Sequence, residues 1–103
     1  MRRRSRGLIS PVNLLEVYAY PGEHAVKFII DPAESPDVES VNVMMTNADG
    51  KPMRFSFKRW GTKVNLSFLI DEATPDGVSI IDISLSRPQV GETRERFDFW
   101  TIK

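Results

Sequence analysis

The stretch TPDGVSIIDISLS, residues 74–86, has the clearest structural pattern in this sequence. It opens with a Pro-Asp-Gly cluster and continues as an apolar segment in which Ile81, Ile83 and Leu85 alternate with polar residues. Pro-Asp-Gly favours a tight turn, and alternation with a period of two favours a strand with one buried face. The stretch therefore predicts a turn that leads into a half-buried strand.

Similar turn signals divide the rest of the chain. Six clusters rich in glycine, proline and acidic residues leave seven segments dominated by β-branched and aromatic residues. None of the segments has the 3.6-residue repeat of an amphipathic helix, so each is predicted to be a strand. The predicted strands are Leu14–Tyr20, His24–Ile30, Val38–Thr46, Met53–Trp60, Val64–Ile70, Val78–Leu85 and Arg94–Ile102.

Length and composition fit one folded domain. The chain has 103 residues, of which 41% are hydrophobic and 27% are charged, values typical of folded chains. It contains no cysteine, which excludes disulfides and cysteine-ligated metal sites. No apolar run approaches the roughly 18 residues of a membrane-spanning helix. Stability must therefore come from packing alone.

Seven short strands in about 100 residues predict an all-β, seven-stranded antiparallel β-sandwich, with a small barrel as the alternative. Strand Met53–Trp60 is expected at a sheet edge because its basic residues discourage pairing with another chain. Trp60 is expected to plug the edge of the core. The predicted core is Val26, Phe28, Val43, Phe55, Leu66, Phe68, Ile81, Ile83 and Phe97.

The tract FLIDEATPDGVSIIDISLS, residues 68–86, and the closing GETRERFDFWTIK, residues 91–103, resemble the last two strands of bacterial immunoglobulin-like and fibronectin-III-like domains. The resemblance extends as a strand pattern over residues 14–102. It implies a β-sandwich in which Phe97 and Phe99 face the core, and in which the acidic loops at 31–39 and 71–76 lie at opposite ends. Those families often carry a tyrosine where this chain has Ser79, so the tyrosine-corner hydrogen bond is not expected.

The N-terminus is basic and the remainder is mildly acidic. Arg2, Arg3, Arg4 and Arg6 lie in the first six residues, and without them the chain has 10 basic against 14 acidic residues. We interpret residues 1–12 as a flexible basic arm and residues 13–103 as the sandwich domain. The four arginines are candidate anion-binding residues. No aromatic residue lies between them, which argues against base stacking, so binding of nucleic acid through this arm is kept only as an alternative to a protein partner.

The sequence contains little that indicates catalysis. His24 is the only histidine, no serine lies in a nucleophile-elbow motif, and no glycine-rich phosphate loop is present. We therefore predict no enzymatic activity, no cofactor and no metal site. No export signal is recognisable, which favours a cytoplasmic or virion-associated protein of bacterial or phage origin over a secreted one.

A second resemblance keeps nucleotide binding open as an alternative. The spacing of Arg2 and Arg6, together with Asp82 and Ser84, resembles the two signatures of PilZ domains, which bind cyclic dinucleotides. The chain departs from the second signature, because Arg87 stands where that motif ends in glycine.

Outward-facing aromatic residues are the main functional candidates. Tyr18 and Tyr20 have the opposite parity to the core residues of the first segment, and Trp100 has the opposite parity to Phe97 and Phe99. First and last strands are commonly neighbours in such sandwiches, so these three rings and Arg96 are predicted to form an exposed patch that binds a protein partner. A carbohydrate is the alternative ligand, and burial of the rings under the N-terminal segment is the alternative structure.

Overall fold

The computed structural model describes residues 8–14, 18–31 and 38–103. It contains seven strands and, within those residues, no helix. No helix in the described part of the chain is long and apolar enough to cross a membrane. The strands are β1 (Ile9–Pro11), β2 (Gly22–Ile30), β3 (Ser40–Thr46), β4 (Phe55–Trp60), β5 (Lys63–Ile70), β6 (Gly77–Arg87) and β7 (Gly91–Thr101).

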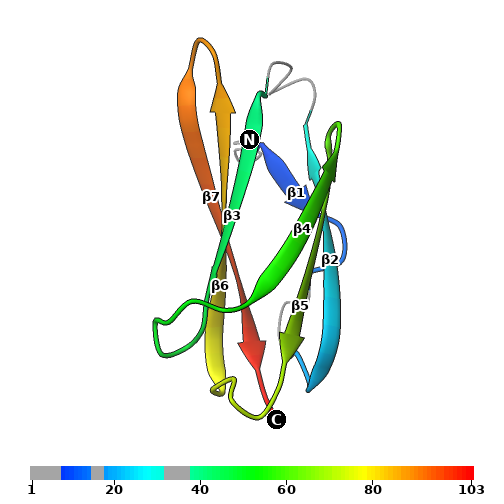
Figure 1. Ribbon diagram of the computed structural model, residues 1–103, viewed down its shortest axis with the longest axis vertical. Coiled ribbons are helices and arrows are strands. Elements are labelled where there is room, and N and C mark those ends of the chain that lie inside the picture. Colours follow the sequence, from blue (N-terminus) through cyan, green and yellow to red (C-terminus); the bar gives the residue numbers. More distant parts are fainter. Residues whose placement is uncertain (1–7, 15–17, 32–37) are drawn as a thin grey trace, which may run out of the picture.

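The strands form two antiparallel sheets that pack face to face (Figure 1). One sheet has the order β1-β2-β5-β4 and the other has the order β3-β6-β7. This is the strand order of the constant-type immunoglobulin sandwich, which confirms the predicted fold class. The longest pairing joins β6 to β7, from Gly77 opposite Thr101 to Arg87 opposite Gly91.

The core lies between the sheets and follows the predicted alternation. Seven of the nine predicted core residues are buried, whereas Phe55 and Phe97 are half-buried and pack against the core. Rings connect the two sheets: Phe28 meets Phe97 at a centroid distance of 5.1 Å, and Phe68 meets Phe99 at 5.2 Å. The aromatic contacts tie β2 and β5 to β7 across the sandwich.

The turn that opens TPDGVSIIDISLS depends on a glycine. Gly77 has a φ of 125°, and a Cβ atom there would lie 2.9 Å from the Cβ of Ala48 in the loop between β3 and β4. Only glycine fits this backbone conformation and this contact. Ser79 follows in β6 with its side chain fully buried, and its hydroxyl has no hydrogen-bond partner among the described residues.

The first strand differs from the prediction. The expected strand was Leu14–Tyr20, but β1 lies at Ile9–Pro11, inside the range assigned to the flexible arm, and pairs with β2. Ile9 is buried, and both it and Leu8 donate backbone hydrogen bonds to Glu95 Oε2 of β7. Of residues 14–20, only Ala19 makes a described β-bridge, to Thr101. A three-residue strand that ends at a proline has too little periodicity to be recognised in the sequence.

Strand β4 lies at the edge of its sheet, as predicted. Arg59 is half-buried, and its guanidinium nitrogens donate to the carbonyl oxygens of Val38 and Glu39 at 3.3 and 3.4 Å, which ties β4 to the segment before β3. The prediction that Trp60 plugs the core edge is wrong. Phe55, Phe57 and Arg59 take the inward positions of β4, so Trp60 faces outward and is 56% exposed.

The connections gather at the two ends of the sandwich as the fold implies (Figure 1). The β4–β5 and β6–β7 turns lie at one end, and the β5–β6 turn, the β3–β4 loop and the C-terminal end of β7 lie at the other. Asp31 N bonds to Leu8 O near the first end. Lys103 Nζ bonds to Glu72 O at the second end. Of the acidic loop at 31–39, residues 32–37, which include Glu34 and Asp37, lie outside the described residues.

Candidate partner-binding surface

The candidate surface is built where residues 18–20 run beside the end of β7. Ala19 forms a parallel bridge with Thr101, and its backbone nitrogen donates to Trp100 O at 2.8 Å. Ala19 and Thr101 are both completely buried. Because side chains alternate along an extended chain, their neighbours on both segments must point outward.

Four large apolar side chains occupy these outward positions, and together they are called the aromatic patch. They are Tyr18, Tyr20, Trp100 and Ile102, with exposed fractions of 48%, 61%, 51% and 38%. The two tyrosine rings stack, with centroids 6.4 Å apart and planes at 27°. Val78 lies directly opposite Trp100 on β6 and extends the apolar row. The patch therefore lies on two neighbouring segments that are joined by backbone contacts at Ala19.

The structure brings together three of the four residues predicted for partner binding and leaves one apart. Arg96 lies four residues before Trp100 on the same face of β7, with Asp98 between them. Its Nε atom lies 3.2 Å from Asp82 Oδ1 on β6, so its charge is already paired. Ile102 was missed by the sequence prediction, although it has the same parity as Trp100.

The other candidate residues form no comparable site. Arg2, Arg3, Arg4 and Arg6 lie outside the described residues. The described part of the chain contains no group of three or more histidine or acidic side chains placed to hold a metal ion. Asp82 and Ser84, from the second resemblance, lie on the outer face of β6, where Asp82 pairs with Arg96.

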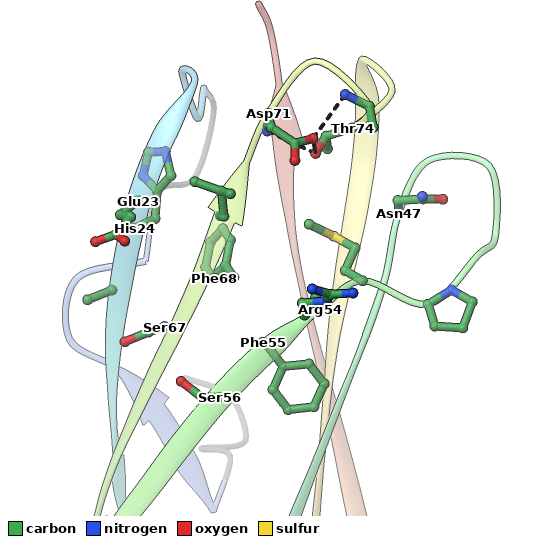
Figure 2. A pocket seen from close by; sticks show the side chains of 15 residues that line it. Glu23, His24, Asn47, Arg54, Phe55, Ser56, Ser67, Phe68, Asp71 and Thr74 are labelled. Carbon is green, nitrogen blue, oxygen red and sulfur yellow. Dashed lines mark hydrogen bonds between the residues drawn. The ribbon is translucent and has the colours of Figure 1, made fainter.

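A groove of about 900 Å³ lies where β4 begins and β5 ends (Figure 2). Phe55, Phe68, Met53 and Leu69 contribute to its apolar lining. Among its polar lining residues, His24, Asp71 and Thr74 make local contacts. The ring of His24 stacks on Phe68 at 5.6 Å, and its Nε2 lies 2.6 Å from Tyr20 O. Asp71 Oδ1 accepts hydrogen bonds from Ala73 N at 2.9 Å and Thr74 Oγ1 at 3.2 Å. The contacts of His24 stabilise the start of β2, and those of Asp71 stabilise the turn after β5, so these side chains do not converge on a ligand.

Comparisons with known proteins identify the fold. No protein-family profile matches the chain, and neither does any curated protein sequence. Solved structures do match. CopC from Methylosinus trichosporium OB3b matches with a TM-score of 0.62 and 10% identity, over 89% of this chain and 88% of that one. The Lin-41 filamin domain matches with a TM-score of 0.59 and 15% identity, over 88% and 90%. The M1 domain of titin matches with a TM-score of 0.53 and 11% identity, over 92% and 95%.

These similarities cover nearly the whole chain at very low identity, so they establish architecture and not activity. The chain has an immunoglobulin-like β-sandwich fold, as the resemblance of its last two strands implied.

Proposed function

We propose that this domain is a non-catalytic interaction module that binds a protein partner through the aromatic patch. The observation that carries the proposal is the exposure of Tyr18, Tyr20, Trp100 and Ile102 on two neighbouring segments. Exposed aromatic side chains give a large contact area at a small cost in conformational entropy, and they are enriched at the centres of protein interfaces.

The neighbours of the patch favour a protein over a sugar as the ligand. A sugar site combines an aromatic platform with polar groups that fix the hydroxyls. Of the outward positions next to Trp100, Ile102 along the chain and Val78 across the sheet are apolar, and Asp98 is the one carboxylate. Arg96, the nearest outward cation of β7 in the chain, is already paired with Asp82. An apolar surface of this composition is suited to apolar side chains of another protein.

The test compares Trp100→Ala with a matched control, Met44→Ala. Met44 is 62% exposed on β3 of the same sheet but lies outside the patch. A partner captured by the wild-type domain is purified, and its Kd is measured for both variants by calorimetry. Trp100→Ala should weaken binding by about 1–2 kcal/mol, roughly 5- to 30-fold, because central aromatic anchors dominate interfaces. Met44→Ala should bind like the wild type.

Thermal melts and a glycan screen complete the experiment. Trp100 is half-exposed, so Trp100→Ala should lower stability by no more than about 1 kcal/mol. A partner that binds Trp100→Ala as tightly as the wild type would refute the proposal. Glycan binding that is lost in Trp100→Ala, without any protein partner, would establish the carbohydrate alternative instead.

A further inference from the structure

The outer face of the sheet β1-β2-β5-β4 gathers cations that the sequence keeps far apart. Trp60 of β4 pairs with Lys63 of β5, and in the next row Lys58 of β4 pairs with Asn65 of β5, which pairs with Lys27 of β2. Adjacent strands lie about 4.8 Å apart and outward residues of one strand about 6.6 Å apart, so these positions form one compact surface. Lys27, Lys58, Lys63 and Trp60 are called the basic sheet face.

The charges of the basic sheet face are unpaired. Lys27, Lys58 and Lys63 are all exposed, and their side chains have no ion pair or hydrogen bond within the described part of the chain. Arg59, Arg96 and Lys103, by contrast, are bound to carbonyl oxygens or to a carboxylate. The acidic residues of the same parity as Lys27 are Glu23 in β2 and Asp31 just after it, each four residues away, which is about 13 Å along an extended strand. The three ammonium groups therefore sum to a local positive potential in a chain of zero net charge.

Trp60 adds an apolar ring to this charge. The side chain is 56% exposed, lies directly opposite Lys63 and is two residues from Lys58. Its outward position follows from the alternation of β4, in which Phe55 and Phe57 face the core. An exposed ring among cations is the combination that binds single-stranded nucleic acids, because the ring stacks on a base while the cations contact the phosphates on either side.

We propose that the basic sheet face binds single-stranded nucleic acid, with Lys27, Lys58 and Lys63 contacting phosphates and Trp60 stacking on a base. An acidic polypeptide is the other polyanion that has to be considered. Carboxylates are recognised best by the two-pronged arginine guanidinium, whereas lysine serves phosphate as a point charge. The three cations of the basic sheet face are all lysines. A carboxylate side chain also has no aromatic base that could stack on Trp60, so a nucleic acid suits this face better than an acidic polypeptide does.

The primary test measures binding of a fluorescein-labelled 15-nucleotide oligothymidylate as a function of salt concentration. Three neutralised phosphates predict a slope of log Kobs against log salt of about −2 for single strands. The variant Lys27→Gln/Lys58→Gln/Lys63→Gln should flatten this slope and lower affinity at least 10-fold at low salt. The control Lys51→Gln/Arg94→Gln/Lys103→Gln removes the same charge from other surfaces and should retain the wild-type slope.

Trp60 provides an independent readout of stacking. The chain has two tryptophans, so Trp100→Phe leaves Trp60 as the sole indole fluorophore, and the oligonucleotide should quench it. Trp60→Ala should weaken binding roughly 5- to 100-fold with the salt slope unchanged, since it removes a stacking contact and no charge. Because all these side chains are exposed, the variants should melt within a few degrees of the wild type.

Three outcomes would overturn the proposal. The first is wild-type binding by the triple lysine variant together with loss of binding when Arg2, Arg3, Arg4 and Arg6 are changed to glutamine, which assigns binding to the N-terminal arm. The second is equal affinity and equal Trp60 quenching with poly-glutamate, which assigns the face to acidic polypeptides. The third is the lack of any binding of oligothymidylate at 50 mM salt.

Discussion

The two outer faces of the sandwich are built by the same alternation but treat charge in opposite ways. On the β3-β6-β7 face, Arg96 is paired with Asp82 on the neighbouring strand, and beyond Asp98 the side chains of Trp100 and Ile102 form an exposed apolar surface. On the β1-β2-β5-β4 face, Lys58 and Lys27 flank the uncharged Asn65 and have no ion partner among the described residues. A cross-strand pair of opposite charges stabilises a sheet, whereas unpaired like charges do not.

This difference separates surface that stabilises the fold from surface that is available for a ligand. The Arg96–Asp82 pair needs no third molecule to satisfy its charges. The lysines of the basic sheet face are satisfied only by water and counterions, which an anionic ligand can replace. The exposed rings of Tyr18, Tyr20 and Trp100 likewise contact water, which an apolar partner can replace.

The largest effect on stability is expected from a substitution in the core between the two sheets, on which both outer faces depend. Phe68 is 5% exposed and its ring contacts His24 in its own sheet and Phe99 in the other. Phe68→Ala should lower the free energy of unfolding by about 3–5 kcal/mol, because it leaves a cavity between the sheets. Urea unfolding gives the value, and Phe55→Ala at the half-buried edge should cost less. An unchanged midpoint for Phe68→Ala would show that the two faces do not share this support.

An intermediate effect is expected in amide exchange at the edges of the two sheets. Strand β4 pairs only with β5, so alternate amides of Phe55–Trp60 point away from the sheet and should exchange rapidly. At the edge of the other sheet, Trp100 O accepts the Ala19 amide, which should be protected. Central β5 and β6 should exchange slowest. Uniform strong protection along β4 in a monomer would mean that its edge is covered.

The smallest effect tests the charge comparison directly with two equal charge changes. Lys58→Gln should raise stability by a few tenths of a kcal/mol at low salt, because it relieves repulsion with Lys27 and Lys63. Arg96→Gln should lower stability by about 0.2–1 kcal/mol, the usual value of an exposed ion pair. Both differences should shrink in 0.5 M salt. If both variants were stabilised, or both destabilised, the two faces would not differ in how their charges are paired.

Much of the fold is predictable from local pattern alone. Six of the seven predicted strands overlap an observed strand, and the alternation places Val26, Phe28, Leu66 and Phe68 in the core. Alternation also predicts which way Tyr18, Tyr20 and Trp100 point, because the parity of a side chain needs no knowledge of the partner strand. The binding role of these residues stays a prediction.

The misses have physical causes. The strand at Ile9–Pro11 is held by its pairing with Ile30 to Phe28 and by the carboxylate of Glu95, a residue 86 positions away, so its own three residues carry almost no signal. Trp60 was assigned to the core edge because large aromatic residues are usually buried, although the parity of Phe55 and Phe57 already placed it outside.

The strand period, the turns and the direction of each side chain can be predicted from the sequence, because turn chemistry and side-chain alternation act over a few neighbouring residues. The stretch TPDGVSIIDISLS predicts a strand with Ile81, Ile83 and Leu85 inward. Which outward residues share a face depends on how the strands pair in the folded domain. Lys27, Lys58 and Lys63 come together, and Arg96 is paired with Asp82, through strand registers set by the packing of the whole core.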